Sequence, residues 1–235
     1  MAAMEGSGLA DTAPRPDRVL GVAIERSYEV FARNRVGTSM VVRRADVTPE
    51  DIAPLAGPVR SVPAAAIDRW LPHAVTTWGT ADDLRALLPR VFELLTAGLL
   101  ATPPEVLFGK IRQADWGEWP IDEIRAVDDI VDALWLATIA EHPAAIDLPA
   151  GRVLTAIAEL GRDLSPHLDD WLLTAASNTD HAAAARRHLA DLARQVDRLS
   201  VAELDLATLF WSPHPQEAER LRDWIASPVV RAQLG

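Results

Sequence analysis

The chain has 235 residues, of which 49% are hydrophobic, and a formal net charge of −11. This length is sufficient for a full hydrophobic core. The absence of cysteine excludes disulfides, thiolate nucleophiles and cysteine-based metal sites. No run of about 18 apolar residues occurs, so no membrane span is predicted. The negative charge is concentrated in residues 46–176, which disfavours binding to nucleic acid.

The N-terminal residues differ in composition from the rest of the chain. Residues 1–16 are small, polar and contain proline, which predicts a disordered tail. They lack the basic start and apolar centre of a secretory signal, so a cytoplasmic location is predicted. Residues 17–235 are expected to form a single all-helical domain.

Apolar residues recur at three- and four-residue intervals along this domain, as in amphipathic helices. The expected helices cover residues 17–34, 49–55, 63–76, 81–97, 103–115, 120–142, 150–161, 166–176, 180–198, 201–210, 215–226 and 228–234. Pro72 and Pro89 fall inside two of them and predict kinks or breaks. Residues 38–47 are expected to be extended or irregular. The short connections predict antiparallel helix pairs that form a compact multi-helix bundle or a short irregular α-α superhelix.

Six helix starts carry a hydroxyl residue at the predicted N-cap position. In four of them an acid follows three residues later, so that the two side chains can form a capping box. These four begin at Thr48, Thr80, Thr102 and Ser200, whereas Ser165 and Ser227 are followed by proline without the acid.

Residues 76–95 contain the most distinctive local pattern. The first four predict the end of a helix, with Gly79 in the left-handed conformation and Trp78 packed beside it. Thr80 and Asp83 are then expected to cap the next helix. The apolar surface of that helix is too broad for one exposed side, so the helix is predicted to be central. The pattern assigns no role to Asp82.

The sharpest chemical motif is a DDxxD sequence, Asp128-Asp129-Ile130-Val131-Asp132. Asp128 and Asp132 share one side of a helix, where they could hold Mg²⁺ bound to a diphosphate, as in all-helical isoprenoid synthases. However, Asp129 points away and no second metal motif occurs, so a solvated helix edge is the favoured interpretation. No metal or cofactor is therefore predicted, and Asp128 and Asp132 are the candidate ligands if one binds.

The aromatic residues are dominated by eight tryptophans. Trp70, Trp135 and Trp171 lie in apolar helical patterns and are predicted to be core residues. Trp116 and Trp119 flank a turn before Pro120 and are expected to be partly exposed. An indole-lined ligand pocket is the alternative to core packing.

Histidines and basic residues provide weaker signals. His181 and His188 are seven residues apart and are expected to face the same way, but no carboxylate completes a ligand set. A basic patch of Arg33, Arg35, Arg43 and Arg44 could contact an anion, although solvated charges near a helix end are the simpler interpretation. The single lysine, Lys110, against 22 arginines is attributed to coding bias. An acidic groove from residues 122–132 and 163–170 is the predicted partner surface.

Two segments carry a resemblance to a known family. Residues 76–95 resemble a TTWGxxDDxxxLPRxxEL core, with one more residue between Asp83 and Leu88 than that pattern has. Trp78, Gly79, Thr80, Asp83 and Pro89 stand out in it. Trp116, Trp119 and Pro120 match a WxxWP turn. Together with a lysine-bearing helix between them, these features resemble a bacterial all-helical family without an assigned activity, over about residues 25–175. Other members carry cysteines in the segment matching residues 41–47, and this chain has none, so no metal or redox role transfers.

The sequence therefore leaves two functional hypotheses. The first is a non-catalytic cytoplasmic helical interaction or scaffold protein whose partner is another protein, with no binding to nucleic acid or membrane. The alternative is a small helical enzyme or ligand-binding protein that uses Mg²⁺ and a diphosphate, or an apolar ligand, at Asp128 and Asp132.

Overall fold

The computed structural model describes residues 15–37, 40–144, 146, 148–198 and 215–234. Within these ranges the chain is all-α, with two isolated β-bridges, Val42–Trp78 and Ala74–Trp78, and no strand. Residues 1–14 of the predicted tail and the expected helix 201–210 lie outside the described ranges. No helix in the described ranges is both long and apolar enough to cross a membrane.

The helices follow one another with short connections. They are α1 (Pro16–Val30), α2 (Pro49–Ile52), α3 (Ala64–Trp70), α4 (Ala81–Thr96), α5 (Pro104–Gln113), α6 (Ile121–Ala140), α7 (Ala150–Glu159), α8 (Ser165–Ala176), α9 (Ala182–Arg198), α10 (Pro215–Ala226) and α11 (Pro228–Arg231). Four 3₁₀ turns separate them: η1 (Phe31–Arg33), η2 (Val59–Ser61), η3 (Leu71–His73) and η4 (Trp116–Glu118).

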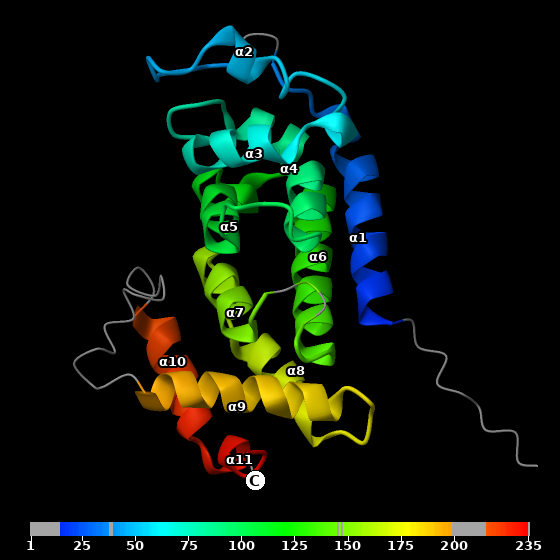
Figure 1. Ribbon diagram of the computed structural model, residues 1–235, viewed down its shortest axis with the longest axis vertical. Coiled ribbons are helices and arrows are strands. Elements are labelled where there is room, and N and C mark those ends of the chain that lie inside the picture. Colours follow the sequence, from blue (N-terminus) through cyan, green and yellow to red (C-terminus); the bar gives the residue numbers. More distant parts are fainter. Residues whose placement is uncertain (1–14, 38–39, 145, 147, 199–214, 235) are drawn as a thin grey trace, which may run out of the picture.

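The helices form a compact bundle (Figure 1). α1 lies along α6, and α9 crosses the end of the bundle opposite to α3 (Figure 1). Arg33 of η1 pairs with Asp122, and Arg26 of α1 pairs with Asp129. Because the residue number rises on one helix as it falls on the other, α1 and α6 are antiparallel.

The core is one cluster of buried side chains that extends from Leu20 in α1 to Val230 in α11. The helix α4 buries ten of its 16 residues, in agreement with its broad apolar surface. Its fully buried side chains are Leu84, Leu87, Leu88, Val91 and Phe92. Burying a side chain of this size contributes about 1.5–3 kcal/mol relative to leaving it exposed.

The predicted helix starts are confirmed at three of the five described positions. Thr48 and Thr80 form capping boxes with the acids three residues later, and the Ser227 hydroxyl accepts a hydrogen bond from the Val230 N–H. The prediction is wrong at Thr102, because Pro103 is the N-cap of α5. It is also wrong at Ser165, which lies inside α8 and donates to Asp163. Ser200 lies outside the described residues.

The predicted helix 63–76 is too long. α3 ends at Trp70 and tightens into η3, in which Pro72 supplies no backbone donor, so the break expected at Pro72 is confirmed. Residues 74–80 form an irregular loop instead of a helix end. Gly79 has the predicted left-handed conformation, with a φ of 86°. The α4 helix, in contrast, continues through Pro89 without a break.

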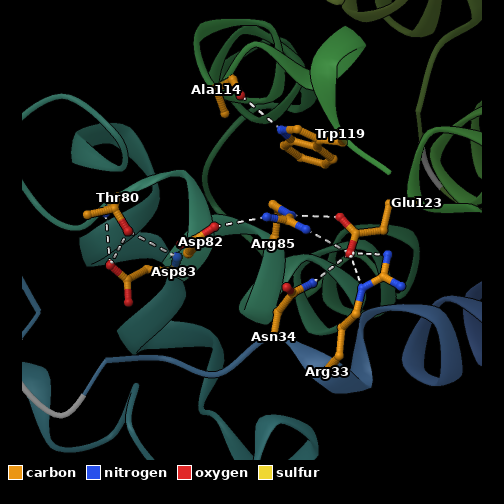
Figure 2. A network of polar contacts seen from close by, with 9 residues as sticks. All are labelled: Arg33, Asn34, Thr80, Asp82, Asp83, Arg85, Ala114, Trp119 and Glu123. Carbon is orange, nitrogen blue, oxygen red and sulfur yellow. Dashed lines mark hydrogen bonds and ion pairs between the residues drawn. The ribbon is translucent and has the colours of Figure 1, made fainter. Parts of the chain in front are cut away.

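A buried carboxylate joins three elements of the bundle (Figure 2). Glu123 of α6 is fully buried and accepts two hydrogen bonds from Arg85 of α4, at 2.6 and 2.9 Å. It also accepts from Arg33 at 2.9 Å and from Asn34 at 3.0 Å. Asp82 holds the other side of the Arg85 guanidinium at 2.9 Å. The role that the sequence did not reveal for Asp82 is therefore to orient Arg85.

Candidate functional site

The residues of the sequence signature have structural roles. The Asp83 carboxylate accepts from both the Thr80 N–H and the Thr80 hydroxyl, at 2.9 Å each (Figure 2). Its second oxygen accepts from the Gly37 N–H at 2.9 Å and so fixes the segment that follows η1. Pro120 is the N-cap of α6. These contacts explain the local fold around Thr80, Asp83 and Pro120.

Trp119 is buried, with 8% of its surface exposed, so the prediction that it is partly exposed is wrong. Its indole N–H donates to the Ala114 carbonyl at 2.9 Å, and its ring lies over the Arg85 guanidinium (Figure 2). The Phe31 ring packs against the Trp119 ring in a T-shaped arrangement. The neighbour in the turn, Trp116, is partly exposed, as expected.

The DDxxD carboxylates point to three different side chains. Asp128 pairs with Arg162, Asp129 pairs with Arg26, and Asp132 lies 3.4 Å from the His167 ring. Burial raises the pKa of Asp128, which opposes its use as an ionised ligand. Among the residues that the structure describes, no three potential ligands are arranged to hold a metal ion.

The predicted acidic groove is also largely occupied by contacts within the chain. Its paired carboxylates are Asp122, Glu123, Asp128, Asp129 and Asp163, each with at least one arginine. These pairs tie α6 and the start of α8 to neighbouring helices. The groove therefore offers a partner few unpaired charges.

A different feature combines a cavity with unpaired cations. A cavity of about 250 Å³ is lined by Val41, Arg43, Val75, Thr76, Thr77, Gly79 and Thr80. The segment 41–43 crosses loop 74–80 through two backbone hydrogen bonds, from Arg43 to Thr77 at 2.8 Å and from Gly79 to Val41 at 2.7 Å. We call this cavity, together with Lys110 next to its wall, the cationic pocket.

The wall of the cationic pocket contains strained backbone. Val75 has a φ of 67°, in the left-handed region that β-branched residues rarely adopt. Such a conformation costs on the order of 1–3 kcal/mol and persists only where the surrounding structure imposes it. Here the neighbouring N–H groups of Thr77 and Trp78 both donate to the His73 carbonyl, at 3.1 Å each. Strain of this kind is concentrated at functional sites, which marks loop 74–80 as a candidate.

Lys110 of α5 is buried against this loop, with 7% of its surface exposed. Its ammonium group lies 3.4 Å from the Thr76 hydroxyl oxygen and 3.2 Å from the Gln113 amide oxygen. Both partners are neutral, so no carboxylate compensates the charge. Burial therefore lowers the pKa of Lys110.

The surroundings of Lys110 include His73, whose neutral form is favoured there. The Arg44 guanidinium lies 2.9 Å from the His73 Nε2 atom and also pairs with Asp46. Because arginine only donates, the His73 nitrogen must accept and is therefore unprotonated. Burial, Arg44 and Lys110 together lower the pKa of His73. The Arg43 guanidinium has no carboxylate partner among the described residues, so it adds an uncompensated charge to the pocket.

Lys110 is expected to reduce the stability of the fold. Replacing it by methionine removes an uncompensated buried charge and keeps the side-chain volume, so the free energy of unfolding at pH 7 is expected to rise by about 1 kcal/mol. Because its folded-state pKa is lowered, the cost of Lys110 is present at neutral pH and disappears as the pH rises towards its unfolded value. The advantage of Lys110→Met is therefore expected to vanish near pH 10.5 in urea unfolding.

Arg112 on the same helix provides a control, because its replacement is expected to change the free energy of unfolding in the opposite direction. Arg112 donates to the Glu159 carbonyl at 2.7 Å and pairs with its carboxylate at 3.3 Å. Arg112→Met is expected to lower the free energy of unfolding at pH 7. If Lys110→Met also lowered it, Lys110 would be a stabilising residue and the argument for a functional charge would be wrong.

Three histidines, His142, His181 and His188, gather at the carboxyl end of α6. His181 and His188 lie 3.0 and 2.7 Å from the carbonyl oxygens of Ala140 and Glu141, so they do face the same way. His142 pairs with Asp191 at 2.7 Å. These contacts hold α9 against the end of α6, which gives the clustering of the three histidines a structural explanation.

The sequence signal for the cationic pocket was the isolated lysine. A chain that uses arginine at 22 positions has one lysine, and this lysine is buried. The basic patch was also identified, but its members separate in the structure, because Arg33 pairs with Asp122 whereas Arg43 lines the pocket.

Comparisons with protein-family models, curated proteins and solved structures find no match to this chain.

Proposed function

We propose that this chain is a non-catalytic cytoplasmic interaction protein that binds an anionic group of a partner protein in the cationic pocket. One observation carries the proposal. Arg43 lines a cavity and Lys110 lies behind Thr76 in its wall, both without a carboxylate partner among the described residues, in a chain whose net charge is −11. Unpaired charges that cost stability are typical of binding sites.

The chemistry of the pocket supports an anion as the ligand. The Arg43 guanidinium can form two parallel hydrogen bonds with a carboxylate or phosphate. Lys110 contributes a point charge behind Thr76, whose exposed side chain can rotate away from it. The cavity of about 250 Å³ accommodates a side-chain carboxylate or a phosphate group, rather than a large cofactor.

Thermal unfolding with inorganic phosphate tests this proposal. A ligand that binds only the folded state stabilises it, by about 1.4 kcal/mol at ten times its Kd. Phosphate is therefore expected to raise the Tm above that in sodium chloride of equal ionic strength. The Arg43→Gln variant is expected to lose this increase.

A matched control is available eight residues earlier in the chain. Arg35 is exposed, belongs to the same basic patch and does not line the pocket. Arg35→Gln is expected to keep the phosphate effect. Equal phosphate effects in the wild-type protein and Arg43→Gln would exclude the pocket as the anion site. If Arg43→Gln does lose the phosphate effect, affinity capture with the wild-type protein, and with this variant as the reference, identifies the partner.

The alternative is a small helical enzyme or ligand-binding protein that uses Asp128 and Asp132. Its support is weaker, because the two carboxylates contact Arg162 and His167 instead of each other. The same thermal assay distinguishes the two sites. The alternative would be favoured if Mg²⁺ and pyrophosphate raised the Tm only when both were present, and if Asp132→Asn removed this increase.

A further inference from the structure

Segment 41–43 has an outer edge whose backbone groups are unpaired. On the inner side, the Arg43 N–H and the Val41 carbonyl form hydrogen bonds with loop 74–80, at 2.8 and 2.7 Å. In a trans peptide unit the C=O and N–H bonds point in opposite directions. The Val42 N–H and the Val42 carbonyl therefore both point away from the loop, and no described residue forms a hydrogen bond with either of them.

The side chains of this segment alternate between two environments. Val41 and Arg43 are exposed and line the cationic pocket. Met40 is buried in the core, and Val42 packs against it. Successive side chains of an extended backbone point to opposite faces, which accounts for this alternation. Segment 41–43 therefore has the geometry of a short edge strand, with one face on the core and the other on the pocket.

We propose that this edge and the cationic pocket together bind an extended acidic segment of a partner protein, which adds to segment 41–43 as an antiparallel strand. The inference rests on the proposed function, because the acid of the peptide is the anionic group that Arg43 holds. It adds the conformation of the partner and the order of its side chains. In strand addition, main-chain hydrogen bonds supply affinity and the neighbouring side chains supply specificity.

The hydrogen-bond geometry determines the register of the added strand. One peptide residue lies opposite Val42, donates its N–H to the Val42 carbonyl and accepts from the Val42 N–H. In an antiparallel pair the preceding peptide residue then lies opposite Arg43, and the following one lies opposite Val41. Side chains that are directly opposite have Cβ atoms about 4.5–5.5 Å apart, which is close enough for an ion pair or an apolar contact.

Charge and exposure determine the side chains that the register favours. Arg43 forms no ion pair with a described carboxylate, so a peptide carboxylate can accept two parallel hydrogen bonds from its guanidinium. Val41 is 47% exposed, and an apolar side chain opposite it removes this surface from water. The favoured peptide therefore reads acid, any residue, apolar residue. Inorganic phosphate can bind the guanidinium but cannot replace the strand that pairs with Val42.

The probe is the peptide acetyl-Thr-Glu-Thr-Val-Thr-amide, titrated into the ¹⁵N-labelled full chain. At saturation, hydrogen exchange of the Val42 amide is expected to slow by about tenfold, because this N–H gains a partner. The Arg43 amide already donates to Thr77 and is expected to keep its exchange rate. Arg43→Gln is expected to weaken peptide binding about tenfold through loss of the charge-assisted hydrogen bonds, and Arg35→Gln to leave it unchanged.

Changes in the peptide test the strand addition without altering the protein. N-methylation of the central threonine removes the donor to the Val42 carbonyl and is expected to weaken binding about tenfold. N-methylation of the valine is the matched control, because that N–H points away from the protein, and it is expected to have little effect. Replacing the glutamate by glutamine, or reversing the order to Val-Thr-Glu, is expected to weaken binding about tenfold.

The possible outcomes separate this inference from the proposed function. If phosphate raises the Tm through Arg43 but the peptide leaves Val42 exchange unchanged, the anion site stands and strand addition is excluded. If the peptide protects Val42, its glutamine form binds equally well and phosphate leaves the Tm unchanged, the acidic partner and the anion site are both excluded. Equal binding of the two N-methylated peptides, or of the reversed peptide, would overturn the antiparallel register.

Discussion

Replacing Glu123 by glutamine is expected to lower the free energy of unfolding by about 3 kcal/mol, because it leaves the largely buried Arg85 guanidinium without its buried counter-charge. Glu123 is fully buried, and the Arg85 side chain is only 17% exposed. Arg85 forms two hydrogen bonds with the carboxylate, whereas a glutamine amide can replace only one of them. The substitution weakens the connection between α4 and α6. Urea unfolding followed by circular dichroism measures the decrease in the free energy of unfolding.

The adjacent acid provides the matched control. Asp122 pairs with the same Arg33 guanidinium, but both side chains are about half exposed. Exposed ion pairs contribute little, so Asp122→Asn is expected to cost about 0.5 kcal/mol. If the two variants were equally stable, the buried carboxylate would not hold the helices together.

The same carboxylate predicts a pH dependence. Burial raises the pKa of Glu123, but the hydrogen bonds from Arg85, Asn34 and Arg33 outweigh this effect, and its pKa is lowered overall. The stabilisation is therefore complete above the unfolded value of about 4.3 and is lost as the pH falls through the folded value. Wild-type stability is expected to fall over this acid range, and that of Glu123→Gln to fall less.

Replacing Trp171 by alanine is expected to cost about 3–5 kcal/mol, as for other fully buried large aromatic residues. Trp171 of α8 has no exposed surface, and its indole N–H donates to the Ala185 carbonyl at 2.9 Å. Its ring packs against Trp135 and Trp224, with centroid separations of 5.3 and 5.6 Å. The substitution therefore creates a cavity among α6, α8 and α10 and removes a partner from a buried carbonyl.

An exposed residue of the same helix serves as the control. Leu173 is 69% exposed, so Leu173→Ala is expected to change the free energy of unfolding by less than about 0.5 kcal/mol. A small effect of Trp171→Ala in the same urea titration would indicate that the C-terminal helices are not packed around the indole cluster.

The sequence could predict features that depend on nearby residues. Thr80 and Asp83 are three residues apart, and the capping box that they form needs no other part of the chain. The fully buried Trp70, Trp135 and Trp171 follow from the apolar periodicity of their helices. The same reasoning failed at Thr102, because Glu105 turns away from the cap and pairs with Arg152 of α7.

Features that depend on distant residues could not be predicted in this way. Trp119 is buried because Phe31 and Arg85 come from other elements, 88 and 34 residues away in the chain. The cationic pocket requires that segment 41–43 cross loop 74–80 and that α5 place Lys110 behind Thr76. Neither arrangement has a periodic or local signature, since both arise from tertiary packing.

The most direct test of the anion site is the titration of Lys110 by NMR in protein labelled with ¹³C-lysine. The single lysine gives one Cε signal, so its pKa can be followed without assignment of other residues. The Lys110 pKa is expected to lie below the unperturbed value of about 10.4, and to rise when inorganic phosphate binds beside it. A titration midpoint at or above that value, unchanged by phosphate, would contradict the existence of an uncompensated cation that binds anions.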